Sequence, residues 1–278
     1  MKRLAALALV LGASFTLGLA AQNAGTADTQ YFSDLHWRLV GPHRPGRLWA
    51  VAGVPDDPTT YYAGTPAGAL WKTTNGGITW ASTSDSLPVT GIGAVAVAPS
   101  NDNVRLVALG NFQIWGTAAG SSTLTNMTGA GMPSHRIGRI QIDPTNPAVA
   151  YVGYSGFNLG AGNHVWKTTN LTSGTPTWAA SGTGLPDVPV NAMVIDPVVS
   201  TRLWVGTDVG VYRSEDGGAS WFPYTTGMPV AAVFDMDMQA SQRILRVGGV
   251  DGGGDLLAAD AFDGGELFAL GLQGQNGA

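Results

Sequence analysis

A pattern that recurs four times along the chain is the strongest constraint on its fold. An apolar residue followed by proline appears at intervals of 43 to 53 residues, at Leu87-Pro88, Met132-Pro133, Leu185-Pro186 and Met228-Pro229. Between these points lie two kinds of short segment. In one, apolar and polar residues alternate up to a turn that contains Pro, Asn or Asp; the other is rich in residues that favour strands and ends in glycine. A unit of about 45 residues with four short strands is typical of one β-propeller blade. The sequence therefore predicts an all-β propeller of about five four-stranded blades.

The composition agrees with this prediction. Among 278 residues there are 40 glycines and 16 prolines, which disfavours long helices. Hydrophobic residues make up 44% and charged residues 12%, so intrinsic disorder and a coiled coil are excluded. There is no cysteine, which excludes disulfides and thiolate metal sites.

A second recurring motif is a turn that ends in tryptophan. It runs from Thr73 to Trp80 and from Ser214 to Trp221, and a copy stretched by insertion runs from Thr168 to Trp178. We expect the Asp or Asn side chain to accept backbone N–H bonds, glycine to supply the positive φ, and tryptophan to be buried between units. These residues are interpreted as structural, not catalytic. They are Thr73, Asn75, Gly77, Thr79, Trp80, Asn170, Trp178, Ser214, Asp216, Gly218 and Trp221.

Two units carry worn copies of the same motif. In the second unit, around Thr125 to Thr128, the motif is predicted to be essentially lost. In the last unit a decayed copy runs from Ala261 to Phe268, with phenylalanine in place of tryptophan.

The turns resemble the Asp-box, also called the bacterial neuraminidase repeat. Together with Asp34 to Pro42 and Val233 to Met238, they make the chain similar to secreted bacterial Asp-box proteins of the sortilin-like group. Similar repeats occur in photosystem II assembly-factor propellers, sialidases and xyloglucanases. The resemblance covers about residues 31 to 247. It implies the fold more than the function, because propellers serve as enzymes and as binding proteins.

The chain is predicted to have four segments. Residues 1–20 have the charged start and apolar run of a cleaved signal peptide, which predicts a secreted or periplasmic protein. Residues 21–30 are expected to be a flexible lead-in and residues 31–247 the propeller. Residues 248–278 form an acidic, glycine-rich segment or a degenerate last blade. A strand around Trp37 is expected to complete the last blade and close the ring.

The charge distribution argues against nucleic acid as a partner. The formal net charge is −5, and it resides in the segment after Arg246, which has no Lys or Arg. The rest of the chain is balanced and has no basic surface of the kind that wraps nucleic acid. We expect a protein or carbohydrate partner, no cofactor, no metal and no membrane span after signal cleavage.

Two similar basic loops are the strongest candidates for a binding site. His43-Arg44-Pro45-Gly46-Arg47 and His135-Arg136-Ile137-Gly138-Arg139 stand in equivalent loops between blades. The predicted ligand-binding residues are His43, Arg44, Arg47, His135, Arg136 and Arg139. They fit an anionic or carbohydrate-acid ligand. The alternative is that each arginine pairs with a neighbouring acid, such as Asp187 or Asp208, and only stabilises the strands.

The pattern of acids favours a binding protein over an enzyme. Xyloglucanases that the chain resembles carry a catalytic Asp in a first-blade Thr-Asp-Val-Gly stretch, and here Pro66 stands at the matching place. Asp208 lies in a Thr-Asp-Val-Gly sequence, but in the fourth blade. Glycoside hydrolysis needs two carboxyl groups, and the catalytic candidates are limited to Asp208 and Asp187. We therefore predict a non-catalytic binding or assembly module. A glycoside hydrolase of sialidase or xyloglucanase type, or a fragment of a larger propeller, are the alternatives.

Overall fold

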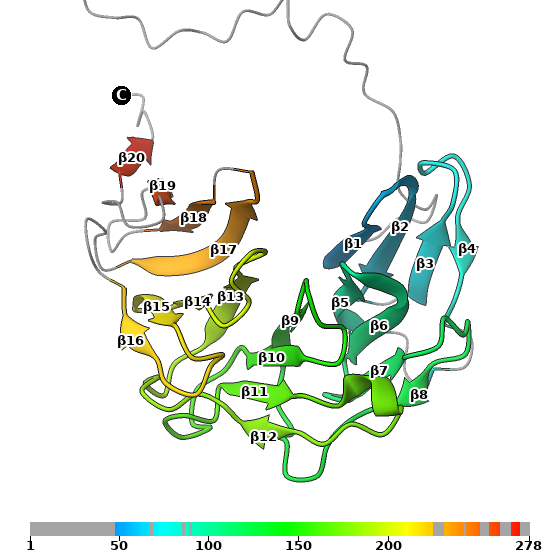
Figure 1. Ribbon diagram of the computed structural model, residues 1–278, viewed down its shortest axis with the longest axis horizontal. Helices are drawn as coiled ribbons and strands as arrows, with labels where there is room; N and C mark the ends of the chain where they lie inside the picture. Colours follow the sequence, from blue (N-terminus) through cyan, green and yellow to red (C-terminus); the bar gives the residue numbers. More distant parts are fainter. Residues whose placement is uncertain are drawn as a thin grey trace, which may run out of the picture. The chain divides into compact units, whose positions relative to one another are not determined.

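The computed structural model describes residues 48–66, 69–84, 87–88, 91–224, 231–241 and 243–250, and the backbone of 256–261 and 268–272. These residues form five four-stranded antiparallel sheets and one 3-10 turn, η2 (Leu171–Ser173). Figure 1 shows the sheets, numbered here 1 to 5 in chain order. The predicted all-β fold of four-stranded units is thereby confirmed. No helix in the described part of the chain has the length and apolar character needed to cross a membrane.

Each sheet is a meander in which consecutive strands pair. Sheet 1 contains β1 (Ala50–Val54), β2 (Asp57–Thr65), β3 (Ala69–Thr73) and β4 (Ala81–Ser82). Sheet 2 contains β5 (Ile92–Ala98), β6 (Asn101–Leu109), β7 (Ile114–Thr117) and β8 (Thr125–Asn126). Sheet 3 contains β9 (Ile137–Ile142), β10 (Ala150–Tyr154), β11 (Val165–Thr168) and β12 (Ala179–Ala180). Sheet 4 contains β13 (Val190–Ile195), β14 (Leu203–Thr207), β15 (Gly210–Ser214) and β16 (Phe222–Pro223). Sheet 5 contains β17 (Ala232–Gln239), β18 (Ile244–Val250), β19 (Leu256–Ala261) and β20 (Phe268–Leu272).

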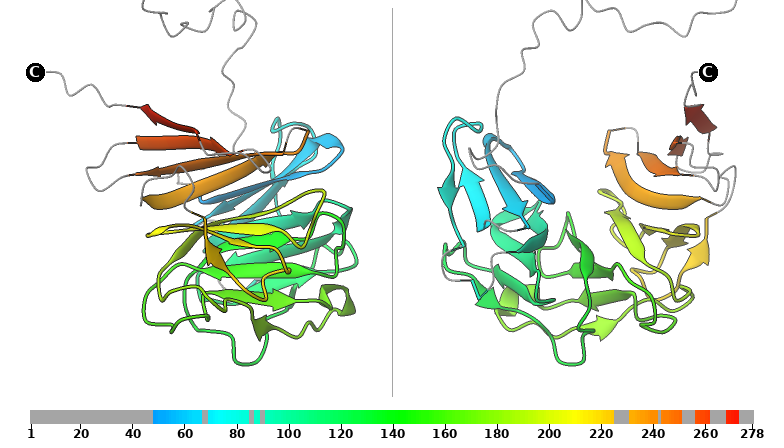
Figure 2. Two further views of the ribbon diagram at one scale, coloured as in Figure 1. Left: turned by 60° about the vertical axis from the view of Figure 1, so that its left-hand side comes forward. Right: turned by 180° about the vertical axis from the view of Figure 1, so that it is seen from behind.

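Consecutive sheets pack face to face through their first two strands. The first strands β1, β5, β9, β13 and β17 contact one another in that order. Figure 2 shows the sheets from two further sides, with colours that follow the sequence. Apolar side chains fill each interface: Leu106 and Val152 belong to one cluster between sheets 2 and 3, and Val194 and Val233 belong to another between sheets 4 and 5. The core is therefore a series of layers between sheets, because each central strand has apolar side chains on both faces.

Sheet 5 and its strands bear on the predicted closure of the ring. Sheet 5 already has four strands, and all of them come from residues 232–272. The boundary predicted after residue 247 falls inside β18. Among the described strands, no packing like that between consecutive sheets joins β1 to β17. The closing strand predicted around Trp37, the signal peptide and the lead-in lie outside the described residues.

Candidate functional site

The turns after β3 and β15 have the hydrogen bonds that their sequences predict. In sheet 4, the Asp216 Oδ1 atom accepts the Ser220 N–H at 2.9 Å, and the Ser214 hydroxyl accepts the Gly218 N–H at 2.8 Å. Gly217 and Gly218 have φ values of 72° and 85°, which favour glycine. The turn after β3 repeats this pattern, with Asn75 accepting the Thr79 N–H at 2.9 Å.

The tryptophans of these turns differ in their burial. Trp221 is 2% exposed and donates its indole N–H to the Ser181 carbonyl of sheet 3 at 2.7 Å. Trp178 is also buried, and it donates to the Met127 carbonyl of sheet 2 at 2.9 Å. Trp80 is only partly buried and donates within its own turn, to the Gly77 carbonyl at 3.2 Å. The burial predicted for all three therefore holds where a described sheet precedes the turn.

The worn copy in sheet 2 lies earlier than predicted. The turn between β7 and β8 runs from Thr117 to Leu124, whereas Thr125 and Asn126 form β8. The Thr117 hydroxyl accepts the Ala119 and Ser121 N–H groups, each at 3.2 Å. This turn has the same length as the one from Ser214 to Trp221, with alanine in place of aspartate and leucine in place of tryptophan. The equal length of the two turns is the sequence signal that could have identified the copy in sheet 2.

An open pocket of about 690 Å³ is the candidate site. Its lining comes from residues in or next to all five sheets. These residues lie at the end of the sheets that carries the loop before each first strand, the β10–β11 loop and the β14–β15 turn. Two of the predicted ligand-binding residues, Arg136 and Arg139, line it, together with Asn191 and Asp208. The structure thus brings together one predicted basic loop and one predicted acid.

Irregular pairing of the first strands shapes this pocket. In each of sheets 2 to 5, the pairing of the first strand with the second skips one residue of the first strand. These residues are Gly93, Gly138, Asn191 and Phe234. All four line the pocket. A bulge turns a side chain away from the regular alternation, so the same local device in four sheets directs residues toward one site.

Arg139 on β9 reaches across sheet 4 to sheet 5. Its Nε donates to the Asn191 carbonyl at 2.9 Å, and its guanidinium forms an ion pair with Asp235 on β17. The side chains of Arg139 and Asp235 are 37% and 77% exposed; Arg139 lines the pocket, and Asp235 follows the lining residue Phe234. The structural alternative for Arg139 therefore holds in part, with Asp235 as the partner in place of Asp187 or Asp208.

Arg136 and His135 have different surroundings, although they are adjacent in sequence. The Arg136 guanidinium lies 5.4 Å from the centre of the Trp49 ring and is exposed. His135 does not line the pocket: its ring stacks on Phe112 with centroids 6.4 Å apart and lies against Gly156. The other predicted basic residues, His43, Arg44 and Arg47, lie outside the described residues.

The two acidic candidates are separated in the structure. Asp208 lies in the β14–β15 turn and accepts a hydrogen bond from the Asn191 amide at 2.7 Å, inside the pocket. Asp187 is not part of the lining; it accepts from the buried His164 imidazole at 2.7 Å and from the Leu159 N–H at 3.1 Å. The hydrogen bond from His164 holds the pKa of Asp187 below its ordinary value. Asp187 therefore anchors the loop between β10 and β11.

Three exposed aromatic residues at the pocket were not anticipated. Trp49, Phe157 and Phe234 are 51%, 55% and 53% exposed, and all three line the pocket. Asp235 was also missed as a candidate. Phe234 and Asp235 are consecutive and both exposed because the strand is irregular there. The three aromatic rings and the two arginines of the lining, Arg136 and Arg139, thus combine flat apolar faces with charged groups in one pocket. No group of His, Asp or Glu side chains suited to a metal ion occurs within the described ranges.

Comparison with known proteins supports the architecture. No family model matches the chain. A curated xyloglucanase of Hypocrea jecorina (strain QM6a) is 27% identical over 206 residues, which cover 58% of this chain and 24% of that protein. The chain thus spans about a quarter of the length of this relative.

Solved structures give the same result at the level of the fold. A GH74 xyloglucanase from Xanthomonas campestris aligns with a TM-score of 0.62 at 21% identity, covering 80% of this chain and 37% of that one. A GH74 enzyme from Niastella koreensis gives 0.67 at 18% identity, with 85% and 38% covered. YCF48 from Cyanidioschyzon merolae gives 0.54 at 20% identity, with 78% and 70% covered. The chain is a β-propeller protein, and its sheets are propeller blades.

Proposed function

We propose that this protein is an exported Asp-box propeller that binds a ligand in the open pocket described above. The ligand is a carbohydrate chain, neutral or acidic, or another chain that carries negative charge. The observation that carries this proposal is the set of three half-exposed aromatic rings, from Trp49, Phe157 and Phe234, around one open pocket. Exposed aromatic rings in a concave site supply apolar contact area, and a few polar groups fix the orientation of the ligand.

The polar groups of the pocket suit such a ligand. Arg136 is exposed beside the Trp49 ring, and its guanidinium can form two parallel hydrogen bonds with a carboxylate. Asn191 and Asp208 add an amide and a carboxylate that can meet sugar hydroxyls. The turns that end in tryptophan are proposed to be Asp-boxes with a structural role, because their hydrogen bonds are made within the turns and to the preceding sheet.

Binding to polysaccharides measures this function directly. Affinity electrophoresis should be run with neutral chains, such as xyloglucan, and acidic chains, such as polygalacturonate. We expect Trp49→Ala and Phe234→Ala to weaken retention at least about tenfold. Phe222→Ala is the matched control, since Phe222 is an aromatic ring on the outermost strand of sheet 4 that is even more exposed, at 64%. If the two pocket variants bind as the parent does, or if no chain is retained, the proposal fails.

A glycoside hydrolase remains the second candidate, because the structure supplies a second carboxylate. Asp208 lines the pocket, and Asp235 forms an ion pair with Arg139, another lining residue of the same pocket. Two carboxyl groups at one site are what hydrolysis of a glycosidic bond requires. Release of reducing ends from xyloglucan that disappears in both Asp208→Asn and Asp235→Asn would favour the hydrolase. Retention without release would favour the binding module.

A further inference from the structure

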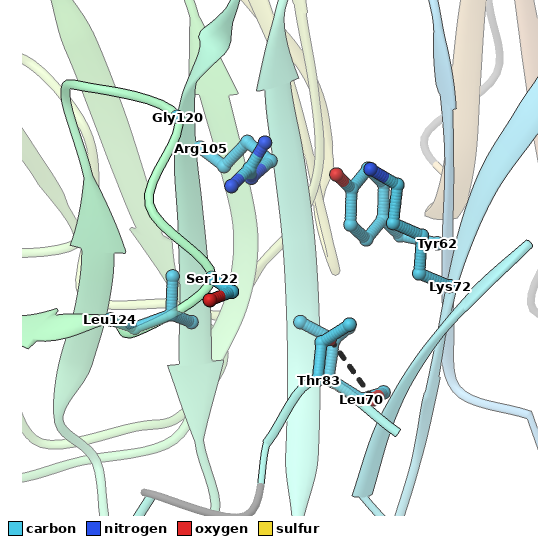
Figure 3. A pocket seen from close by; sticks show the side chains of 8 residues that line it. All are labelled: Tyr62, Leu70, Lys72, Thr83, Arg105, Gly120, Ser122 and Leu124. Atoms are coloured by element: carbon cyan, nitrogen blue, oxygen red, sulfur yellow. Dashed lines mark hydrogen bonds between the residues drawn. The ribbon is translucent and has the colours of Figure 1, made fainter. Parts of the chain in front are cut away.

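A second, smaller pocket of about 80 Å³ lies between sheets 1 and 2. Figure 3 shows its lining: Tyr62 and Lys72 of sheet 1 face Arg105 of sheet 2, and Thr83 and Ser122 stand at the same gap. None of these residues lines the pocket of the proposed function. The inference below therefore goes beyond that function.

The repeat provides an internal comparison for this pocket. Tyr62 pairs with Lys72 across β2 and β3, as Tyr151 pairs with Lys167 across β10 and β11. In both sheets the lysine Nζ lies near the centre of the tyrosine ring, at 5.5 Å and 5.3 Å. The Tyr–Lys pair is thus the same structural feature in sheets 1 and 3.

Between sheets 3 and 4, this pair has a hydrogen-bond partner. The Gly217 carbonyl, in the turn of sheet 4, accepts from the Lys167 Nζ at 2.8 Å and from the Tyr151 hydroxyl at 3.0 Å. Leu203 and Trp221 of sheet 4 pack into the same interface and are buried. The cation is therefore balanced by this carbonyl dipole and by the nearby carboxylates of Asp143 and Asp216, whose charges favour its protonated form.

Between sheets 1 and 2, two of these residues are exchanged. Leu124 takes the place of Trp221 at the end of the turn, which removes most of the volume of the side chain. Arg105 pairs with Thr117 on β6 and β7 where Leu203 pairs with Ser214 on β14 and β15, so an arginine replaces the buried leucine. The exchange opens a pocket and adds a second cation to it.

The two cations face one aromatic ring. The Arg105 Cζ lies 5.4 Å from the centre of the Tyr62 ring, on which Lys72 also lies. Arg105 donates to two neutral carbonyls, those of Asp102 at 3.3 Å and Ser121 at 2.8 Å. Across the described residues no carboxylate forms an ion pair with Lys72 or Arg105. Each cation is attracted to the ring, while the two like charges repel each other.

We propose that this pocket binds a small oxyanion, namely phosphate, sulfate or a single carboxylate group. The lysine supplies a point charge and the arginine a planar fork, which together match the oxygen atoms of such a group. Ser122, an exposed residue, also belongs to the lining. The pocket has room for only a few heavy atoms, since one water takes about 30 Å³ of the liquid. The ligand is therefore an anion or the acidic end of a larger molecule.

Thermal melting at constant ionic strength tests this site, with sodium chloride exchanged for sodium sulfate, phosphate or acetate. Because sulfate and phosphate stabilise proteins in general by exclusion from their surface, we expect at least one of these oxyanions to raise the melting temperature of the full chain more than it raises that of Arg105→Leu. The order among the three distinguishes a tetrahedral anion from a carboxylate. If none of the three raises the melting temperature of the parent more than that of the variant, the proposal is wrong.

Variants locate the effect within the molecule. Arg105→Leu, which restores the residue found in sheet 4, and Lys72→Met should each weaken the affinity for the oxyanion about tenfold or more in titration calorimetry. Lys167→Met is the matched control and should leave this affinity unchanged. Equal affinity in the parent and in either pocket variant that folds would overturn the assignment. Because Arg105→Leu should still bind polysaccharide, failure of this site and failure of the proposed function can be told apart.

Discussion

Arg139 and Asp235 form an ion pair that joins sheet 3 to sheet 5 across the first strand of sheet 4. Sheets that are not neighbours in the series are thus connected at the pocket by one charged contact. The same guanidinium also donates to the backbone of β13, so its position depends on three sheets at once. A ligand that competes for either charge would change the link between them.

The first prediction concerns the strength of this link. Both side chains are partly exposed, so solvent screens their attraction. In a double-mutant cycle with Arg139→Met and Asp235→Asn, we expect a coupling free energy of about 1 kcal/mol or less. Urea unfolding at low and high salt measures it. A coupling that is large and unaffected by salt would contradict the exposed geometry.

The second prediction concerns the tryptophans of the turns. Trp221→Ala should destabilise the protein by roughly 3–5 kcal/mol, because it removes a buried ring and its hydrogen bond to sheet 3. Trp80→Ala should cost less, about 1–2 kcal/mol, because Trp80 is only partly buried and bonds within its own turn. Chemical denaturation of both variants gives the comparison. Equal losses would show that burial does not set the difference.

The third prediction concerns acid sensitivity. A hydrogen bond from the Ser220 hydroxyl, helped by the Ser220 N–H, lowers the pKa of Asp216 from 3.8 to about 2. A lowered pKa in the folded state stabilises the protein above the ordinary pKa, and this contribution is lost as the pH falls from about 4 toward 2. Asp216→Asn keeps an acceptor that does not titrate. We expect it to lose less stability than the parent over this range, measured by urea unfolding at each pH.

The outcome of that comparison has a built-in control. Asn75 holds the equivalent place in sheet 1 and cannot titrate. Asn75→Ala should therefore lower the free energy of unfolding by a similar amount at pH 7 and at pH 3. A pH-dependent effect of Asn75→Ala would mean that the acid response arises elsewhere.

The fourth prediction concerns the support of the pocket. A Cβ on Gly156 would overlap the His135 imidazole, so Gly156→Ala should destabilise the protein by roughly 1–3 kcal/mol. The double variant with His135→Ala should recover part of this loss. Gly53→Ala is the control, since a Cβ there meets the Tyr61 ring at an ordinary 3.7 Å. Thermal melting of the four proteins decides the matter.

Much of the fold could be predicted because its signals are local. Turns such as Ser214 to Trp221 carry their own hydrogen bonds, and the alternating runs identify the strands. The worn turn from Thr117 to Leu124 was misplaced because alanine and leucine replace the residues that define the motif. Its length was preserved, since the turn must still connect the same two strands.

The site could be predicted only in part because it depends on irregular pairing. Arg136 and Asp208 were found from residue type and loop position. Phe234 and Asp235 were missed, since two consecutive exposed residues interrupt the alternation on which strand analysis relies. Asp187 was a reasonable acid to name, but its bonds to His164 and Leu159 use it for anchoring, and no local pattern reveals a partner 23 residues away.

The layered core has a further consequence for how stability is distributed. Since each apolar interface is shared by two consecutive sheets, the chain approximates a one-dimensional array, in which stability is a sum of unit and nearest-neighbour terms. A substitution inside one interface should then weaken local protection from hydrogen exchange on its two sides before it reaches distant units. Such an array can also gain or lose a unit in evolution while its other interfaces are conserved, which accommodates propellers of different blade number within one repeat.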